Sequence, residues 1–545
     1  MLIKRRVNMG KTATKISRNT YTGGELFGYL VGMFGQNLIY QVIAAGLVSV
    51  YLGTVLYIPA AAVSIILFAA RIWDAINDPM MGTIVDRTHT KWGKCRPYLI
   101  FFPAIIGVMT VLCFMNGIYT SPGASKALIV AWAAVSYIIW GMLFTVCDIP
   151  LWGITSLMTE DENDRAKIIG LARMAAGVGG IGTIVSFIPD FLKGMFEGKY
   201  NAMVGIDGYT QQMANNDTKK AAWIATVVII TVFATICFEI AGLVTRERVP
   251  GDAEDKRGII DNFRIMFACR PFRQILISGV LRSPLQLLMI LAMPLMLYYY
   301  TDNAFDNVGN LDGGQRIIKI GLIAIAVFIP QFAAMAITPA LVKKYENKSI
   351  YNFYTIVGAI PYALIFVAYV VFKGNLLGWA AAIITAVCIG LAAASMGGIN
   401  VMQSIMIADC VDYEEYHKGY RPDGVFFSGQ SFLTKLSGGI AALIQGLVYT
   451  IVKFSGENLD NINYRLTQGE QFFKMDPIVQ GTDMGKYAAA MFFLISIPVA
   501  LGMLLSAIPM KSYGMTDAEH KDMLAALVAK REAAKADAPA ESEEA

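Results

Sequence analysis

Long apolar stretches separated by short polar segments run along most of this 545-residue chain. A helix needs about 20 mainly apolar residues to cross a bilayer, and twelve stretches reach that length. They lie at 25–52, 57–85, 97–117, 126–156, 166–190, 221–245, 272–299, 317–340, 350–372, 376–406, 425–453 and 488–510. The runs are continuous and much longer than the alternating strands of a membrane β-barrel. The pattern therefore predicts an all-α membrane protein with twelve transmembrane helices.

A charged segment divides these predicted spans into two equal sets. Residues 246–271 separate six spans at 25–245 from six at 272–510. The segments GTIVDRTHTK and PALVKKYENK, which follow the second span of each set, are both basic and stand at matching places. We therefore expect two related six-helix bundles joined by a central cytoplasmic loop.

The distribution of basic residues predicts the orientation of the chain. Lys and Arg concentrate in an N-terminal arm at 1–24 and in the loops after the second and eighth spans, and such residues favour the cytoplasmic side. Both termini are therefore expected in the cytoplasm, and the loops at 191–220 and 454–487 outside. The arm lacks the features of a cleaved signal peptide. The tail at 511–545 is cytoplasmic, and we expect its acidic, alanine-rich end at 531–545 to be disordered.

Composition agrees with a membrane protein and excludes several other classes. Hydrophobic residues make up 56% of the chain and charged residues only 16%, with a mean hydropathy of +0.52; a soluble protein carries about 25% charged residues. A net charge of +4 gives no reason to expect a nucleic-acid partner. The seven Cys residues show no paired spacing, which argues against a disulfide framework and a zinc site.

Three carboxylates lie inside predicted spans, where an ionisable residue is costly and indicates a functional site. Asp74 and Asp78 are four residues apart, so they share one helix face, and Asp148 lies at a similar depth in the fourth span. Carboxylates that converge repel one another unless a cation joins them. A hard cation prefers oxygen ligands, and Asn77 and Thr145 would add neutral oxygens. The alternative is that these carboxylates face cytoplasmic water at helix ends.

Two basic residues also fall inside predicted spans. Arg173 and Lys435 are flanked by small residues, which permit close approach of neighbouring helices. We expect them to hold a polar ligand or to balance the carboxylates. The alternative is that each base extends its charged end to the membrane interface.

Several segments carry a family resemblance. RIWDAINDPMMGTIVDRTHTKWGKCRPYLI closely resembles the signature of the glycoside–pentoside–hexuronide:cation symporters, and the likeness continues in IIWGMLFTVCDIPLWG, LARMAAG, IMIADCVDYEEY and TKLSGG. The resemblance implies a major-facilitator fold in the cell membrane that couples uptake of a sugar to a cation gradient. In that fold the solute site lies at the interface of the two halves.

The resemblance also implies roles for individual residues. The cation site would consist of Asp74, Asn77, Asp78, Thr145 and Asp148. The sugar site would consist of Asp148, Trp152, Arg173 and Lys435, together with Gln36 and Asn37. The last two replace a Lys–Asp pair of the family's best-known sodium-coupled member, and Asn400 replaces a tryptophan, so the identity of the sugar stays open. The polar residues expected at the cytoplasmic gate are Asp86, Arg87, Asp409 and Asp412.

The expected function is symport of a glycoside with a monovalent cation, sodium before proton or lithium, with no further cofactor or metal. A carrier of the same fold for another solute, such as a uronate or a lipid headgroup, is the first alternative. A membrane-embedded transferase is the second. Such an enzyme needs a nucleophile, a metal site or a phosphate-binding loop, and the sequence shows none, so we expect no enzymatic activity.

Overall fold

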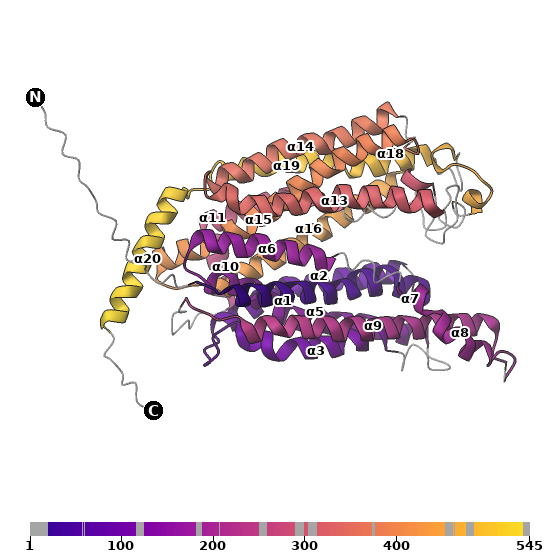
Figure 1. The fold of residues 1–545 in the computed structure, drawn as a ribbon, viewed down its shortest axis with the longest axis horizontal. Helices are drawn as coiled ribbons and strands as arrows, with labels where there is room; N and C mark the ends of the chain where they lie inside the picture. The colour runs from indigo at the N-terminus through magenta and orange to yellow at the C-terminus, as the bar shows by residue number, and fades with distance from the viewer. Residues whose placement is uncertain are drawn as a thin grey trace, which may run out of the picture.

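The computed structural model is mostly helical in the part of the chain that it describes, where no strand is present, and it forms two lobes (Figure 1). It describes residues 20–56, 58, 60–115, 125–180, 188–206, 208–249, 259–288, 291, 299–302, 313–372, 376–452, 462, 464–475 and 484–537. Nine of the described helices are long and apolar enough to cross a membrane. The chain is therefore a multi-pass membrane protein, as the hydropathy pattern predicts.

The first half of the chain supplies most of one lobe. Its helical elements are α1 (Gly23–Gln41), the π-helical η1 (Val42–Val55), α2 (Ala60–Asp86), α3 (Arg96–Phe114), α5 (Lys126–Leu157), α6 (Glu162–Gly180), α7 (Ile188–Leu192), α8 (Gly194–Asn201) and α9 (Gln211–Val244). α1 packs against α9 and α6, and α3 packs against α5 and α9.

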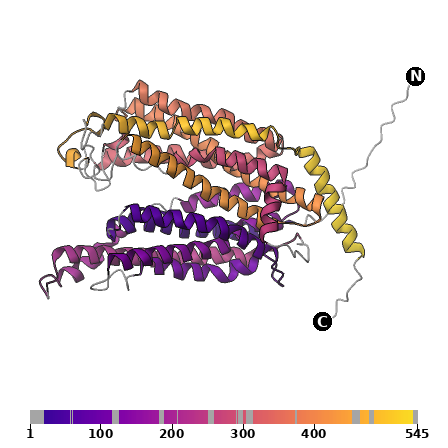
Figure 2. The same ribbon diagram turned by 180° about the vertical axis from the view of Figure 1, so that it is seen from behind.

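The second half supplies the other lobe and the C-terminal helix. Its elements are α10 (Ile259–Ala268), α11 (Arg270–Leu281), the 3-10 helix η3 (Ser283–Gln286), α13 (Gly313–Val342), α14 (Asn347–Val371), α15 (Trp379–Lys418), α16 (Asp423–Ile451), η5 (Phe472–Lys474), α18 (Met484–Leu494), α19 (Ile497–Met510) and α20 (Asp517–Asp537). The lobes meet where α6 packs against α13 and where α2 packs against α16. Figure 2 shows the same separation of the lobes from behind.

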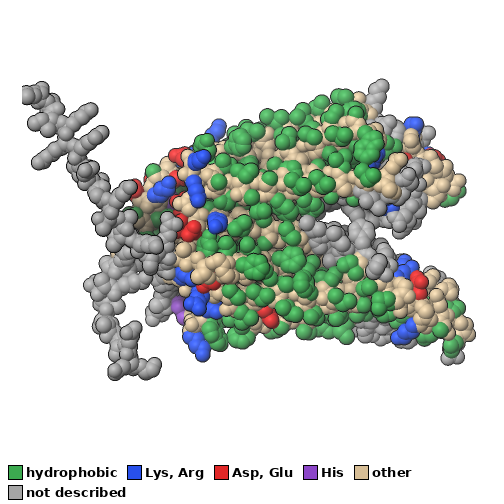
Figure 3. Space-filling model, in the orientation of Figure 1, with side chains coloured by type: hydrophobic (Ala, Val, Ile, Leu, Met, Phe, Trp, Pro, Cys, Tyr) green, Lys and Arg blue, Asp and Glu red, His purple; other side chains and the backbone are tan. Residues whose placement is uncertain are grey.

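α20 crosses one end of the molecule (Figure 1), which we call the terminal end; the opposite end is the far end. α1 begins at the terminal end and α5 ends there. Both helix ends contact the segment that precedes α10, which lies at that end: Thr22 through Glu25, and Leu157 through its carbonyl oxygen. Figure 3 shows a hollow between the lobes at the far end. The described side chains at the terminal end are instead joined by ion pairs across the lobes.

The ends of several helices follow from local sequence. The Thr22 hydroxyl accepts a hydrogen bond from the Glu25 amide while the Glu25 carboxylate accepts one from the Thr22 amide, which caps α1. Pro97 and Pro271 lie in the first turns of α3 and α11, where a missing amide hydrogen costs nothing. α15 ends at Gly419 with φ of +77°, a conformation that glycine adopts without strain.

The expected disorder of the tail at 531–545 is wrong for the part that the structure describes. α20 extends from Asp517 to Asp537, and residues 538–545 lie outside the described part. The segment is rich in Ala, Leu, Glu and Lys, which favour helix. Thr516 and Glu519 also form reciprocal side-chain to amide hydrogen bonds that cap its first turn.

The expected spans also differ in detail from the helices. The predicted span at 272–299 is interrupted after Leu281, where Pro284 lies in the short η3 and lacks an amide hydrogen for a continuing α-helix. The expected central loop contains the helix α10. α9 begins at Gln211, ten residues before the predicted span. Thr210 caps its first turn, because the Thr210 hydroxyl accepts a hydrogen bond from the Met213 amide. Residues 1–19 of the predicted arm lie outside the described part.

Candidate functional site

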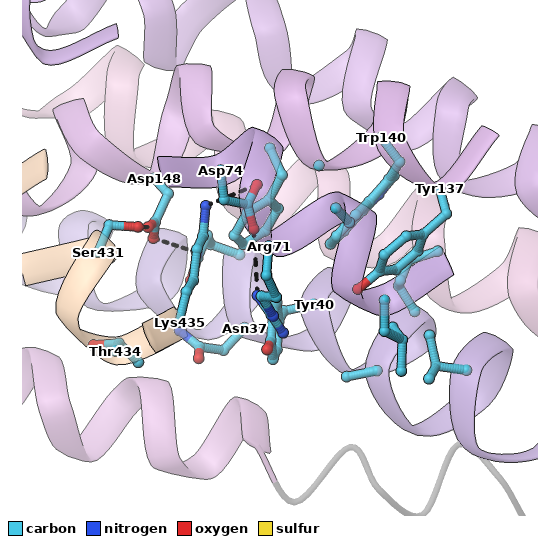
Figure 4. A pocket seen from close by; sticks show the side chains of 18 of the residues that line it. Asn37, Tyr40, Arg71, Asp74, Tyr137, Trp140, Asp148, Ser431, Thr434 and Lys435 are labelled. Carbon is cyan, nitrogen blue, oxygen red and sulfur yellow. Dashed lines mark hydrogen bonds and ion pairs between the residues drawn. The ribbon is translucent and has the colours of Figure 1, made fainter. Parts of the chain in front are cut away.

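A cavity of about 340 Å³ lies between the lobes. Its walls come from α1, η1, α2, α5 and α6 of the first half and from α16 of the second. Figure 4 shows the polar side chains that converge on it, with Asp74, Asp148, Ser431 and Lys435 close together. The predicted substrate residues Gln36, Asn37, Asp148, Trp152, Arg173 and Lys435 all line this cavity.

Two of the predicted cation ligands share one ammonium group. The Lys435 Nζ lies 2.7 Å from Asp78 Oδ1 and 3.3 Å from Asp74 Oδ1. The Thr145 hydroxyl donates to the same Asp78 oxygen over 3.0 Å. The one-turn spacing of the two carboxylates on α2 brings them to one side of the helix. α16 supplies one positive charge, and Arg71 of α2, 3.3 Å from Asp74, supplies a second. Lys435, predicted for the substrate or the charge balance, thus contacts the carboxylates directly.

The Asp78 side chain retains an oxygen that accepts no hydrogen bond from any described residue. Asp78 is 0% exposed, and its Oδ2 and the neighbouring Asn77 Nδ2 are both buried without a partner. Buried polar atoms are nearly always satisfied, so an orphan requires an explanation. The Asp78 oxygen has a free lone pair and can ligate a small cation that takes oxygen ligands, whereas the orphaned Asn77 nitrogen is a donor and cannot. Such an ion would take its further ligands from the side-chain oxygens of Asp74, Asn77 and Thr145.

Asp148 lines the cavity and has different partners from Asp78. Its Oδ1 accepts from Gln36 Nε2 over 2.9 Å, and its Oδ2 accepts from the Ser431 hydroxyl over 3.3 Å. The carboxylate therefore joins α1 of the first half to α16 of the second. Asn37 donates to Gln36 Oε1 over 2.6 Å and to the Met33 carbonyl oxygen over 3.0 Å. The amides of Gln36 and Asn37, which stand where the family's best-known member has a Lys–Asp pair, thus form a chain of hydrogen bonds that ends on Asp148.

Arg173 places its planar guanidinium group in the wall of the cavity, beside Trp152. Its guanidinium carbon lies 4.1 Å from the centre of the Trp152 ring, a cation–π geometry. Its Nη2 donates to Ser404 Oγ on α15 over 2.6 Å, and Nε donates to the same oxygen over 3.2 Å. Carboxylate, amide, indole and guanidinium together supply hydrogen-bond acceptors, donors and a flat face for a polyhydroxylated ligand.

The terminal end is closed by a first set of contacts between α2 and α16. The Lys94 Nζ lies 3.2 Å from Asp86 Oδ1 and 2.7 Å from Asp423 Oδ2. The Asp86 carboxylate accepts from the backbone amides of Gly424 and Val425 over 2.8 Å and 2.9 Å, at the start of α16, where negative charge is favourable. The predicted gate residue Asp86 therefore ties the two lobes together.

A second set of contacts joins α6 to α15. Asp412 lies 2.5 Å from Arg165 Nη1 of the first half and 2.8 Å from Arg421 Nη1. His520 of α20 approaches Asp412 Oδ2 at 3.3 Å and Asp409 Oδ1 at 3.9 Å. Asp409 also accepts from Asn347 Nδ2 over 3.0 Å. The predicted gate residues Asp409 and Asp412 thus lie together where both lobes and the C-terminal helix meet.

Arg87 does not join this closure. Its side chain is exposed and makes no ion pair with any described residue; Lys94 provides the base beside Asp86 instead. Sequence reasoning missed the residues that complete the two sets of contacts: Lys94, Arg165, Arg421, Asp423 and His520. The sequence identified Lys94 only as a basic loop residue. Its partner Asp423 lies 329 positions away, and no local pattern connects the two.

Comparisons with known proteins identify the relatives of the chain. It is 26% identical over 441 residues to the isoprimeverose transporter of Lactiplantibacillus pentosus, covering 80% of this chain and 82% of that one. It is 23% identical over 432 residues to a glucuronide carrier protein homologue of Escherichia coli, covering 77% and 83%.

Solved structures give the fold. The crystal structure of the E. coli major facilitator superfamily transporter FucP matches with a TM-score of 0.52 at 10% identity, over 90% of this chain and 99% of that one. A family model described as MFS/sugar transport protein matches residues 28–471. The chain has the major-facilitator fold and belongs to this family of transporters, within the glycoside–pentoside–hexuronide symporter group that its sequence resembles.

Proposed function

We propose that this protein imports a glycoside together with a monovalent cation, sodium before proton or lithium. One observation carries the proposal: the buried Asp78 carboxylate has an oxygen that no described residue satisfies, and it shares the Lys435 ammonium with Asp74. Lys435 and Asp74 line the cavity together with Asp148, Trp152 and Arg173. Oxygen ligands for an ion thus adjoin a set of groups suited to sugar hydroxyls. The similarity to transporters of isoprimeverose and, by name, of glucuronides supports a glycoside as the solute.

The cation competes with Lys435 for the carboxylates. When no ion is bound, the Lys435 ammonium pairs with both Asp74 and Asp78, and Arg71 also pairs with Asp74. Two positive charges thus balance the two carboxylates and keep them from repelling each other. An ion bound to the free Asp78 oxygen, Asn77 and Thr145 takes over part of that charge balance. Lys435 then shifts its contacts toward the cavity that Asp148 also lines. This exchange couples the ion to the sugar site.

Transport proceeds by alternating access of the cavity to the two sides of the membrane. We assign the terminal end, where α1 begins and α20 lies, to the cytoplasm, because the basic residues of the loops lie there. The structure is then closed on the cytoplasmic side by the contacts of Asp86 and Asp412 and hollow on the outer side (Figure 3). Binding of ion and sugar favours the opposite state, in which these ion pairs separate.

The test is uptake by vesicles that contain the purified full-length protein. Labelled glycosides of glucose, galactose, xylose and glucuronic acid are each offered with an inward gradient of sodium, lithium or protons. We expect one glycoside to accumulate only with an inward cation gradient, and we expect that glycoside to raise the affinity for the cation as much as the cation raises the affinity for the glycoside. Accumulation that is independent of all three gradients would contradict the proposal.

A further inference from the structure

Three buried groups of the kind that ligate metal ions converge at the terminal end, outside the central cavity; we call them the junction cluster. Asp409 and Asp412 are three residues apart on α15, so they share one face of that helix, and His520 comes from α20. One ligand atom from each residue lies within 4.8 Å of the other two. All three residues are at most 2% exposed. Two carboxylates and an imidazole are thus held together away from water.

Two buried oxygens at this place accept no hydrogen bond from any described residue. One is Asp409 Oδ1, which faces His520 Nε2 at 3.9 Å. The other is Asn347 Oδ1, on a residue that is 3% exposed. The Asn347 Nδ2 donates to Asp409 Oδ2 over 3.0 Å, and this bond orients the amide so that its free atom is the oxygen. Buried acceptors are nearly always satisfied, so two free oxygens side by side indicate a cation.

The distances within the junction cluster suit a small divalent ion. Zinc in a tetrahedral site lies about 2.0–2.2 Å from nitrogen and oxygen ligands, which therefore stand roughly 3.3–3.6 Å apart. His520 Nε2 lies 3.3 Å from Asp412 Oδ2 and 3.9 Å from Asp409 Oδ1, so a small movement of Asp409 completes the set. An imidazole ligand favours zinc and other transition metals over magnesium and calcium, which prefer oxygen ligands alone.

The charges around the junction cluster also favour a cation. Asp412 is balanced by arginine, with Arg165 Nη1 at 2.5 Å, whereas Asp409 forms no ion pair with a Lys or Arg of the described residues. The carboxylate of Glu162, at the start of α6, adds a negative charge that acts on both Asp409 and His520. A divalent ion therefore reduces the repulsion among these groups.

A second cavity adjoins the junction cluster, because Lys521, which follows His520 on α20, is part of its wall. Its volume is about 260 Å³. Three carboxylates and two ammonium groups line it: Asp161, Glu162, Asp164, Lys343 and Lys521. The carboxylates outnumber the ammonium groups, so a cation that enters this cavity is attracted toward the buried ligands.

We propose that Asp409, Asp412 and His520 form a binding site for a divalent transition-metal ion such as zinc, with Asn347 Oδ1 beside them as a further ligand. The ion binds Asp412 Oδ2 in place of Arg165, whose Nη1 contacts that oxygen. It thus fastens α20 to α15 and releases one tie between the lobes. In the metal-free protein, Arg165 and the His520 imidazolium balance the same carboxylates. No local motif predicts this site, since His520 lies 108 positions from Asp412.

The first experiment measures zinc binding by the full-length protein in lipid nanodiscs. The protein is purified without a polyhistidine tag, stripped of metal with a chelator and titrated calorimetrically with zinc chloride. We expect one zinc ion to bind per chain. His520→Gln removes the nitrogen ligand and Asp409→Asn removes a charge. Each should weaken zinc binding at least about tenfold, because even the groups that support metal ligands contribute that much.

Two further variants separate ligation from the surrounding charge. His417→Gln alters an exposed histidine at the end of α15 and should leave zinc affinity unchanged. Arg165→Gln removes the guanidinium that competes for Asp412 and should strengthen zinc binding at least about threefold, since a positive charge beside the ion opposes it. Melting temperatures without zinc show whether each variant is folded. Zinc should raise the melting temperature of the unaltered protein, by mass action, but not that of His520→Gln.

The contrary outcomes are equally specific. Equal zinc affinity in His520→Gln and His417→Gln, or no binding by the unaltered protein, would overturn the site. Binding of several ions whose number and affinity no variant changes would show adventitious binding only. Tighter binding of magnesium than of zinc would overturn the class of metal, and weaker zinc binding by Arg165→Gln would overturn the exchange with Arg165. None of these measurements involves a glycoside, so a failure of the proposed function leaves them unaffected.

Discussion

Asp78 lies beside the cavity, behind Lys435, and Arg173 lines it, so single substitutions should separate their effects. Asp78 contacts Lys435 and Thr145 and keeps an oxygen for an ion. Arg173 contacts Trp152 and Ser404. These two groups of contacts share no partner, so a change in one should leave the other largely in place.

Asp78→Asn should abolish cation-coupled accumulation while the protein still inserts and binds sugar weakly. The amide keeps the shape of the side chain but removes the charge that attracts the ion and pairs with Lys435. We expect sodium-stimulated uptake in vesicles to fall to the level without a gradient. Asp217→Asn, which alters the hydrogen bond to Tyr209 far from the cavity, serves as the control. Sodium-stimulated uptake by Asp78→Asn at the normal rate would show that Asp78 is not a cation ligand.

Arg173→Ala should weaken sugar binding at least about tenfold, since charge-assisted hydrogen bonds are worth more than neutral ones, and should change sodium affinity little. Arg173→Lys should restore only part of the affinity, because an ammonium lacks the planar fork that stacks on Trp152 and bonds Ser404. Calorimetric titration of each ligand in nanodiscs measures both. If sodium affinity fell as far as sugar affinity in Arg173→Ala, Arg173 would instead be a counter-ion that maintains the cavity.

Asn37 tests the departure from the family pattern. Its amide extends the chain from Gln36 to Asp148, so Asn37→Asp adds a carboxylate beside an existing one. A carboxylate accepts strongly from sugar hydroxyls but repels a uronate carboxylate across a low-dielectric cavity. We expect the variant to bind neutral galactosides more tightly and glucuronides more weakly. An unchanged profile across the glycoside panel would show that Asn37 only packs α1 against its neighbours.

At the level of elements, the crossing of α2 and α16 controls the closure at the terminal end. A Cβ atom at Gly82 would lie 2.5 Å from the Gly424 carbonyl oxygen, so Gly82→Ala should separate the helices and open that end. The buried Cys95 beside Lys94 reports the opening. We expect alkylation of Cys95, measured by peptide mass spectrometry, to become several times faster than in the unaltered protein.

Gly446→Ala on α16 is the matched control, because a Cβ atom there meets nothing within 4 Å. Equal alkylation of Cys95 in both variants would mean that the α2–α16 contact does not hold the closure.

The sequence predicted the long helices better than the points at which helices are interrupted. Continuous apolar runs of helical length predicted most long helices, because a span must satisfy its backbone internally. The interruption at η3 depends on Pro284, and helices often tolerate proline within membranes, as at Pro79 of α2. The four-residue spacing of Asp74 and Asp78 likewise predicted a shared face, whereas their pairing with Lys435 depends on the packing of α16, which no local spacing encodes.

At the scale of the whole molecule, closure depends on groups that are distant in sequence. Arg165, Asp412 and His520 come from α6, α15 and α20, and Asp517 of α20 accepts from the Asn347 amide at the start of α14. α20 therefore fastens to the second lobe and contributes to the junction with the first. In the sequence, this segment is a polar tail with one histidine. A histidine near the end of a chain is usually solvated, so nothing in the sequence predicted that His520 is buried.

His520 makes this closure dependent on pH. Burial opposes its charged form, but Asp409 and Asp412 outweigh that effect and raise the pKa of His520 from 6.5 to about 9. Glu162 of α6 acts in the same direction. Because the folded pKa lies above the unfolded value, the stabilisation is fully present below pH 6.5 and is lost as the pH rises through 9.

We therefore expect the melting temperature of the purified protein to fall by a few degrees between pH 6.5 and pH 9.5, as the contacts at the terminal end loosen. His520→Gln removes the titrating group, so it should lower the melting temperature at pH 6.5 and flatten this pH profile. His417→Gln alters an exposed histidine at the end of α15 and should leave the profile unchanged. A His520→Gln profile as steep as that of the unaltered protein would place the pH dependence elsewhere, and the ion pairs of Arg165 and Arg421 would then hold the closure without α20.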